Sequence, residues 1–566
     1  MLRLHHTCLA ALLYAAVTLI LAWPLALNPR SSVMPGDPDT DLFMWTLAWN
    51  THALTTDPLS VFDANIYYPH RTTLAFSENL LGSTIFAAPV LWATGDMLLS
   101  LNAVALLSIV LSGTGAFILG RALGLGVAGA IVCGLVFAFS PARFFRLGQI
   151  HLATMQWVPF CLAFVHLYLD RGRRRDLRLG VAFFTLQALT SGHGAVFLMV
   201  ALFCLLGYRF ALGERIDLVG RIRDLGVSGV LLAAPVLALL IPYRFVQNEF
   251  GLKRALGDWE TPVSSFFASQ GPVHRILFDW LGMSFAEEPS AYLFPGFIVL
   301  ILAAVSLLPR RVPFRRRVPV TPPASPQAGA GWRGFAAAHR GNFVALYGLL
   351  TLVSLMLAAG PPIGLWPLVY DLPGFSFLRV PSRFVLLGVL GLAVLAGVGF
   401  ERLTGRLHAR GRAIAAAVAG LVLIAECMTI PLPGYRKYGV VIPAADRWLA
   451  TQPGPLVIAE LPSDHHNERR QSTFMLHSTA HWQKTVHGHS GIRTPFHQDL
   501  YEKLRGFPST ASMDALEAVG VTHIVLHPEM YEPQDWQRAE AGFPAVRDRL
   551  ETVYDDGDSQ VFRLRR

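Results

Sequence analysis

The first long apolar run of the sequence, about residues 8–28, is followed by Pro35-Gly36-Asp37-Pro38-Asp39-Thr40-Asp41. This stretch holds three carboxylates, and its glycine and prolines disfavour a regular helix. An amphipathic helical pattern begins directly afterwards, with Trp45 and Trp49 four residues apart on one face. Because tryptophan favours the headgroup level of a bilayer, the pattern predicts a cluster of acids at a membrane surface.

Two interpretations of this acidic stretch stay open. In the first, it is a solvated turn in which Asp39 or Asp41 caps the helix that follows. In the second, it is a functional site that presents carboxylates to the polar head of a lipid-borne substrate, because carboxylates gather at sites as well as at caps. A cap needs only one carboxylate, and the presence of three invites a second explanation.

Composition indicates a multi-span membrane protein. The chain has 566 residues, of which 53% are hydrophobic and 15% charged, whereas about 25% of the residues of soluble proteins are charged. The formal net charge of +9 does not indicate nucleic-acid binding, because the arginines stand in short clusters between apolar runs, which is the positive-inside pattern. All five cysteines lie in apolar segments, so neither a disulfide framework nor a cysteine metal site is predicted.

Twelve apolar runs and four arginine clusters define the expected topology. Two runs separate each cluster from the next, which places the clusters on the cytoplasmic side. Five runs precede the first cluster, which with the N-terminus inside would place that cluster outside. Either one run does not cross, a further crossing is hidden, or the N-terminus lies outside. The run at 79–98, interrupted by glycine and proline, is the candidate for a re-entrant or interfacial segment. The runs lie near 8–28, 79–98, 100–120, 126–141, 151–169, 178–192, 194–212, 225–243, 291–309, 343–360, 382–400 and 413–430, and the clusters at 171–178, 209–223, 310–317 and 402–412.

The predicted fold is mainly α: a polytopic membrane helix bundle of about 11 to 13 spans with a C-terminal extracytoplasmic α/β domain. The first run is interpreted as a retained span rather than a cleaved signal peptide. The membrane domain covers 1–430 and the soluble domain 431–566, where charge rises and short strand-like runs begin. The domain's predicted strands are 455–461, 521–526 and 560–564, its helices lie near 443–451 and 510–519, and the membrane domain has outer loops at about 29–78 and 244–290 and a flexible cytoplasmic loop at about 310–342.

Polar residues recur at the predicted outer ends of the spans. In the first loop, His70 offers a proton-transfer group and Arg71 a phosphate donor, and Glu78 follows them. The turns that contain Gln149 with His151 and Gly192 with His193 each put a histidine at a span end, where ionisable groups usually face a cavity. For all of these residues, simple anchoring at the membrane edge is the alternative.

The stretch Arg379-Val380-Pro381-Ser382-Arg383 departs from the positive-inside trend. Two arginines four residues apart at an outer span end suit an anion, such as the phosphate or diphosphate of a lipid carrier. Snorkelling arginines or an ion pair with the acidic loop are the alternatives.

The tail is rich in histidine. Asp464-His465-His466 and His487-Gly488-His489 could attract a transition metal, but no His-Glu-x-x-His or Cys-x-x-Cys motif accompanies them, so the metal ligands stay unassigned. No nucleotide-binding loop is evident either, so ATP-driven transport is not indicated. Further histidines of this tail include His477, His481 and His497.

With these motifs, the chain resembles the GT-C superfamily of integral-membrane glycosyltransferases, and within it the YfhO-type and related bacterial glycosyltransferase-like membrane proteins. The resemblance rests on the Asp-x-Asp of the first outer loop, the two histidine turns and the Arg379–Arg383 stretch. It also rests on the order of a first span, a large outer loop, many further spans and an outer α/β domain, which covers nearly the whole chain.

The resemblance implies a polyprenyl-phosphate-linked sugar as donor, a glycan, lipid or protein as acceptor, and inverting transfer on the outer face of the cell (cytoplasmic) membrane. It implies that a first-loop acid is the base, and Asp39 or Asp41 is assigned this role, with Asp37 as third candidate. Some members have Asp-Glu here, and this motif has no glutamate, so the position of the base stays open.

The remaining roles follow from the same resemblance. Arg379 and Arg383 would hold the carrier phosphate, with His151 and His193 as supporting residues, and Mg²⁺ or Mn²⁺ could assist. The alternative function is a non-enzymatic flippase or transporter of lipid-linked glycans, or a scaffold derived from the same fold. Neither paired intramembrane charges nor inverted repeats are visible, and acids at the surface favour the enzyme.

Overall fold

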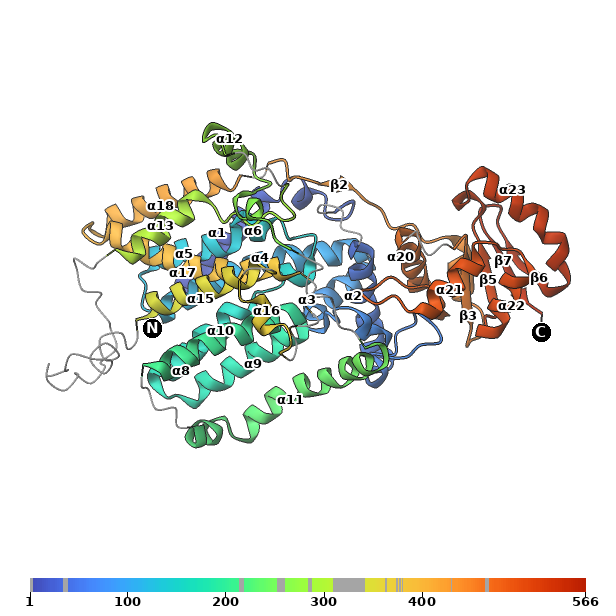
Figure 1. Ribbon diagram of the computed structural model, residues 1–566, viewed down its shortest axis with the longest axis horizontal. Helices are drawn as coiled ribbons and strands as arrows, with labels where there is room; N and C mark the ends of the chain where they lie inside the picture. Colours follow the sequence, from blue (N-terminus) through green and yellow to red (C-terminus); the bar gives the residue numbers. More distant parts are fainter. Residues whose placement is uncertain are drawn as a thin grey trace. The chain divides into compact units, whose positions relative to one another are not determined.

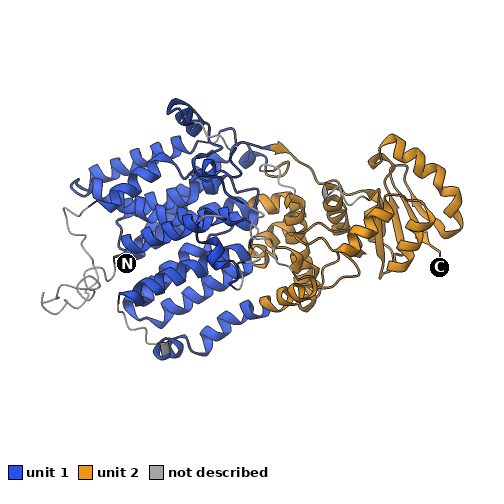
Figure 2. Cartoon of the chain, viewed as in Figure 1, with its two compact units in different colours: residues 1–28, 104–238, 252–435 blue, residues 29–103, 239–251, 436–566 orange. Residues whose placement is uncertain are grey.

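The computed structural model describes residues 4–33, 39–212, 218–251, 260–283, 288–308, 342–361, 364–372, 375, 378, 380–428, 430–463 and 468–565 (Figure 1). The chain folds into two compact units, each assembled from separate stretches of sequence (Figure 2). Unit 1 comprises Met1–Asn28, Val104–Ala238 and Leu252–Tyr435, and unit 2 comprises Pro29–Ala103, Leu239–Gly251 and Arg436–Arg566.

Each of the twelve predicted apolar runs coincides with a helix. Within the described ranges, six helical segments are long and apolar enough to cross a membrane, and four shorter apolar helices accompany them. The chain is therefore an integral membrane protein, while the number of crossings and the sidedness stay predictions. The helices are α1 (Leu4–Leu21), α3 (Leu81–Thr94), α4 (Met97–Ala122), α5 (Val127–Phe139), α8 (Trp157–Arg171), α9 (Arg174–Thr190), α10 (Gly192–Ala211), α11 (Leu218–Phe250), α13 (Phe297–Leu307), α15 (Phe343–Ala358), α17 (Val385–Thr404) and α18 (Ala409–Glu426).

Unit 1 is organised around α17, which packs against α5, α13 and α15. In its most apolar stretch, 94% of the residues are buried, against 17% in α11. Glycines allow this close packing, as is common between membrane helices. A Cβ atom at Gly399 would collide with the carbonyl oxygen of Leu302 in α13, and one at Gly397 would lie 2.7 Å from the carbonyl oxygen of Gly129 in α5.

Unit 2 contains a five-stranded sheet in the order β4-β3-β5-β7-β6. The strands β4, β3 and β5 are parallel, and β5, β7 and β6 are antiparallel. The predicted strands and helices of the tail are all present, and the sequence analysis missed β4 and β6. The elements are β3 (Val457–Leu461), β4 (Lys484–Thr485), β5 (His523–Leu526), β6 (Leu550–Asp555) and β7 (Gln560–Leu564), with α19 (Ala444–Leu449), α20 (Glu468–His477), α21 (Pro495–Leu504), α22 (Thr510–Val519) and α23 (Pro533–Gly542).

Helices cover both faces of this sheet. Ile458 and Val525 pack with α19 on one face, while Ala459 and Ile524 pack with α21 and α22 on the other. This alternation is the period of two that a strand imposes on its side chains. Consequently, every second residue of β3 and β5, Glu460 included, points toward the α19 face.

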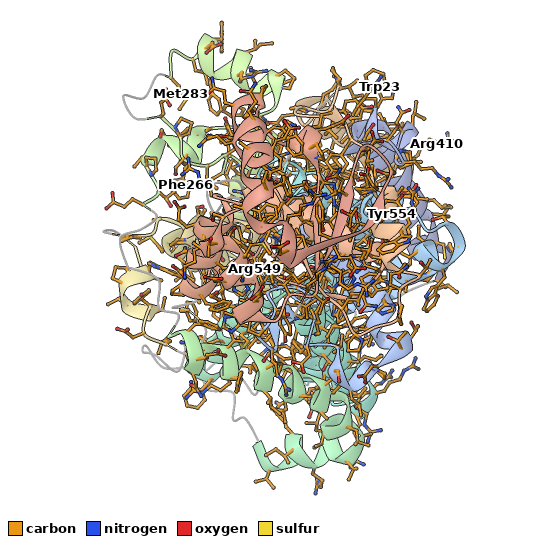
Figure 3. All side chains as sticks on the ribbon, turned by 90° about the vertical axis from the view of Figure 1, so that its right-hand side faces the viewer. Trp23, Phe266, Met283, Arg410, Arg549 and Tyr554 are labelled. Atoms are coloured by element: carbon orange, nitrogen blue, oxygen red, sulfur yellow. The ribbon has the colours of Figure 1, made fainter. Side chains whose placement is uncertain are left out.

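The strand β6 is tied to helices on both sides of the sheet. Arg549, immediately before β6, pairs with Asp514 and Glu517 of α22, with nitrogen–oxygen distances of 2.8 Å to each. The ring of Tyr554 lies 5.3 Å from that of Trp448 in α19. Arg549 and Tyr554 are labelled in Figure 3.

The predicted first outer loop is an ordered part of unit 2. It contains α2 (Asp39–Thr56), which packs against α3 and α20. Residues 65–68 run along the free side of β4: the Thr485 N–H donates to the Asn65 carbonyl at 2.8 Å, and the Tyr68 N–H donates to the Thr485 carbonyl at 3.0 Å. These hydrogen bonds cover an exposed sheet edge.

The packing units do not follow the predicted division at residue 430. Residues 29–103 belong with the tail rather than with the helical bundle, while the division by membrane and solvent stays a prediction. The second outer loop begins later than predicted, because α11 continues to Phe250. The predicted cytoplasmic loop at 310–342 lies almost entirely outside the described residues.

Candidate functional site

The acidic stretch leads into α2, and its two described carboxylates have different surroundings. Asp39 and Asp41 lie in the first turn of α2, where the helix dipole favours negative charge. Asp41 is buried, and it accepts hydrogen bonds from the Tyr438 hydroxyl and, at 2.8 Å, from the Ser472 hydroxyl. Burial and the Asp41 carboxylate raise the pKa of Tyr438, which keeps this phenol protonated as a donor. Asp37 lies outside the described residues.

The Asp39 carboxylate is more accessible. Its side chain is 39% exposed, and its Oδ1 lies 3.4 Å from Nε2 of His489. Asp41 therefore has both oxygens engaged by the tail, whereas the Asp39 carboxylate is partly accessible to solvent. The sequence analysis had left these two acids as alternatives and had not identified Tyr438 or Ser472.

The polar residues at the end of the first loop also belong to unit 2. Nδ1 of His70 lies 3.6 Å from Oε1 of Glu249, at the end of α11, and the His70 ring contacts several phenylalanines. Arg71 is exposed, and Glu78 is half-buried. The contact with Glu249 thus gives His70 a structural role, besides its predicted role in substrate binding.

The predicted histidine and arginine motifs converge in unit 1. Nη1 of Arg383 lies 2.8 Å from Nε2 of His193, and the rings of His193 and His151 are 5.2 Å apart. The Ser191 hydroxyl donates to the His151 carbonyl at 2.6 Å, which joins the two histidine turns. Gln149 accepts a hydrogen bond from Arg146 at 2.9 Å. Arg379 lies outside the described residues.

The three residues of this histidine–arginine cluster lie at or just before the N-terminal ends of helices. His151 lies in α7 (Ile150–Ala153), His193 in the first turn of α10, and Arg383 in the 3-10 turn Pro381–Phe384 that precedes α17. With Arg383 as donor, Nε2 of His193 is the acceptor, so this imidazole is neutral. A guanidinium beside imidazoles at the end of membrane helices is a suitable place for an anionic group.

Among the described residues, one group of histidines and carboxylates is close enough to bind a metal ion. It consists of Asp446, Glu460, His477 and His527, and it includes neither Asp39 nor Asp41. The sequence analysis missed this group, because its members are distributed between residues 446 and 527 without a recognisable spacing.

The helical bundle, the acid-led α2 and the α/β tail together define a GT-C fold: the chain has the fold of the GT-C membrane glycosyltransferases, as the resemblance implied. No protein-family model matches the chain, and no curated protein sequence does. The YfhO-type assignment within the superfamily stays a prediction.

Solved structures supply the comparison. The mycobacterial arabinofuranosyltransferase AftD aligns with 100% of this chain at a TM-score of 0.59 and 15% identity, and the chain spans 40% of the length of AftD. The oligosaccharyltransferase AglB from Archaeoglobus fulgidus aligns over 99% of this chain and 74% of the AglB chain, at a TM-score of 0.44 and 14% identity. ArnT from Cupriavidus metallidurans aligns over 98% of this chain and 97% of the ArnT chain, at a TM-score of 0.43 and 13% identity.

Proposed function

We propose that this protein is a membrane glycosyltransferase that moves a sugar from a polyprenyl-phosphate donor to an acceptor on the extracytoplasmic face. The observation that carries the proposal is the alignment of the entire chain with AftD, an arabinofuranosyltransferase. The acceptor is a glycan, a lipid or a protein.

Asp39 is the proposed base. The acceptor hydroxyl gives its proton to the Asp39 carboxylate as its oxygen attacks the anomeric carbon. The bond between that carbon and the donor phosphate oxygen breaks, and the polyprenyl phosphate leaves with the bonding electrons. Asp39 suits this role because 39% of its side chain is accessible to solvent, while Asp41, hydrogen-bonded to Ser472, positions the first turn of α2.

The cluster of Arg383, His193 and His151 is the proposed binding site for the carrier phosphate. A guanidinium binds a phosphate through paired, charge-assisted hydrogen bonds. Arg379, Gln149, Arg71 and Glu78 stay predicted substrate-binding residues. Mg²⁺ or Mn²⁺ also stays a prediction.

The test uses the purified protein in lipid with a panel of polyprenyl-phosphate sugars, polyprenyl-phosphate arabinofuranose included, and measures release of polyprenyl phosphate. We expect Asp39→Asn to lower the rate of release by about 10² or more, as for loss of a general base. The control is Asp57→Asn, since Asp57 is an exposed acid directly after α2.

Two outcomes would change the proposal. Normal release by Asp39→Asn together with loss of release by Asp41→Asn would transfer the role of base to Asp41. No release from any donor, while labelled polyprenyl-phosphate lipid still binds and Arg383→Ala abolishes that binding, would favour a flippase or a scaffold.

A further inference from the structure

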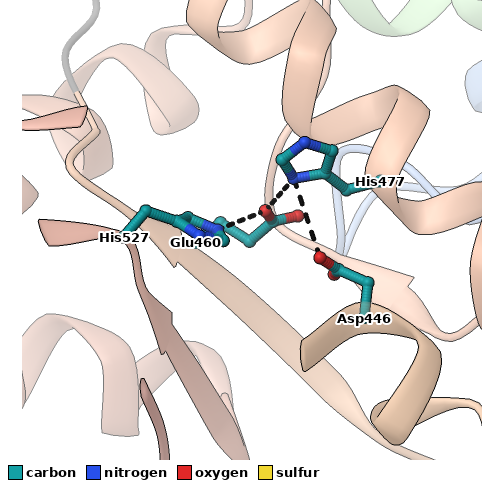
Figure 4. Close-up of side chains that lie close together, drawn as sticks. All are labelled: Asp446, Glu460, His477 and His527. Carbon is teal, nitrogen blue, oxygen red and sulfur yellow. Dashed lines mark hydrogen bonds and ion pairs between the residues drawn. The ribbon is translucent and has the colours of Figure 1, made fainter. Parts of the chain in front are cut away.

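The sheet of unit 2 brings two carboxylates and two histidines together on one face. Glu460 of β3 points toward the α19 face, as does His527, which directly follows β5. Asp446 reaches this place from α19 and His477 from the end of α20. One possible ligand atom from each side chain lies within 4.8 Å of all the others (Figure 4).

All four side chains are buried, with exposed fractions of 0% for Asp446 and Glu460, 2% for His477 and 3% for His527. Oε2 of Glu460 lies 2.6 Å from Nδ1 of His477 and 3.0 Å from Nε2 of His527. Oδ2 of Asp446 lies 3.8 Å from Nδ1 of His477, beyond hydrogen-bond distance. Two carboxylates thus share one enclosed space.

Within the described part of the chain, neither oxygen of Asp446 has a hydrogen-bond partner, and neither does Oε1 of Glu460. The nearby Nε2 of His481 is also without one, 3.6 Å from Oδ1 of Asp446. Buried carboxylates cost several kcal/mol unless they are paired or coordinate a cation. Three carboxylate oxygens at this point therefore keep lone pairs that no hydrogen bond from the described residues uses.

Neighbouring residues orient the group as they do around bound metals. Nδ1 of His527 lies 2.9 Å from the Ser559 hydroxyl, which turns Nε2 toward Glu460. His487, predicted as a possible ligand, is not available: its Nε2 accepts the Glu460 N–H at 2.6 Å, and its Nδ1 lies 2.8 Å from Oε1 of Gln471. The other predicted pair, His465 and His466, lies outside the described residues.

We propose that Asp446, Glu460, His477 and His527 bind one transition-metal ion, with Zn²⁺ as the best fit. Imidazole nitrogen combined with carboxylate oxygen suits zinc, whereas Mg²⁺ and Ca²⁺ prefer oxygen alone. A tetrahedral zinc site has ligand atoms about 3.3 Å apart, so these side chains need to move by less than about 1 Å. Four buried protein ligands make a closed, structural site that joins α19 and α20 to β3 and β5.

The test measures the metal content of the full-length protein in detergent after loading with Zn²⁺ and exhaustive dialysis. We expect about one Zn²⁺ per chain, as for other four-ligand structural sites. A strong chelator should lower the Tm, and Co²⁺ should give the visible absorption of a four-coordinate ion. These measurements on the unaltered protein do not depend on glycosyl transfer.

Variants distinguish this group from a chance surface site. His527→Gln and Asp446→Asn should lose the ion, and Ser559→Ala should weaken Zn²⁺ affinity about 10-fold, because it removes only the orienting contact. The control is His523→Gln, which changes the first residue of β5, four positions before His527 and outside the group. Absence of retained metal in the unaltered protein, a Tm insensitive to chelator, or full retention in His527→Gln would each overturn the proposal.

Discussion

Asp39 and Asp41 lie on the same turn of α2, yet the tail engages them differently. Asp41 is enclosed and hydrogen-bonded to Tyr438 and Ser472, while Asp39 remains 39% exposed. The local sequence shows that acids gather at the start of this helix. It could not rank them, because the residues that bury Asp41 lie some 400 positions away, and a single sequence carries no signal for that pairing.

Removal of one donor to Asp41 tests its structural role. We expect Ser472→Ala to destabilise unit 2 by about 1.5–3 kcal/mol, because a hydrogen bond to a buried charged group is lost. The measurement is the Tm of the purified protein in detergent. Thr473→Ala is the control, since this neighbouring hydroxyl donates only to the Arg469 carbonyl in its own helix. Equal Tm values for both variants would contradict the role of Ser472.

His497 makes the stability of unit 2 sensitive to pH. Burial lowers the pKa of His497 to about 3, although its contact with the Tyr68 carbonyl opposes this shift. Between the usual value of 6.5 and about 3, the unfolded chain binds the proton that the folded chain excludes. Stability is therefore lost as pH falls below 6.5, by up to about 1.4 kcal/mol per pH unit.

The variant His497→Gln removes this titration. We expect its Tm to fall less steeply than that of the unaltered protein between pH 6.5 and 4.5, whatever the effect of the substitution at pH 7. His408→Gln, at an exposed position, serves as the control and should keep the original slope. Parallel pH profiles for all three proteins would show that His497 does not cause the effect.

At the scale of elements, prediction succeeded where the pattern is local. Long apolar runs predicted the membrane helices, and the apolar stretch 455–461 predicted β3. The sequence analysis missed β4, which has two residues, and β6, whose burial pattern does not alternate cleanly. Such strands form because neighbouring strands offer hydrogen-bond partners, and their own residues carry little of that information.

The packing of α17 depends on glycine. We expect Gly399→Ala to destabilise unit 1 by at least about 1–3 kcal/mol, because the added methyl group would overlap the backbone of α13 at Leu302. Gly207→Ala in α10 is the matched control. A Cβ atom there meets nothing within 4 Å, so the substitution should be neutral or mildly stabilising. The measurement is again the Tm, and a smaller loss for Gly399→Ala than for Gly207→Ala would refute this packing.

At the scale of the whole molecule, unit 2 is assembled from three separate stretches of the chain. The sequence predicted the α/β content of the tail, but it did not predict that residues 29–103 would complete the same unit. Residues 65–68 cover the edge at β4 through backbone hydrogen bonds, and such bonds are nearly independent of side-chain identity. The four candidate metal ligands were missed for a different reason: they are spread between residues 446 and 527, and only the folded sheet brings them together.

Deletion of residues 436–566 tests this interdependence. We expect amide hydrogen exchange to rise strongly in residues 39–78, because the backbone groups of 65–68 lose their partners in the tail. Peptides from α17 provide the internal control, since α17 packs within unit 1 and should keep its protection. Unchanged protection in residues 39–78 would mean that the first loop folds without the tail.

The pairing of Asp41 with Ser472 across 431 residues also determines when unit 2 is finished. A ribosome adds about 5–20 residues per second, so the start of α2 is made about 20–90 s before its partner exists. During that interval, Asp41 of the nascent chain lacks the Tyr438 and Ser472 hydroxyls that later donate hydrogen bonds to it. Completion of this unit is thus among the last events of biosynthesis, and a prematurely terminated product would carry the acidic motif without its finished surroundings.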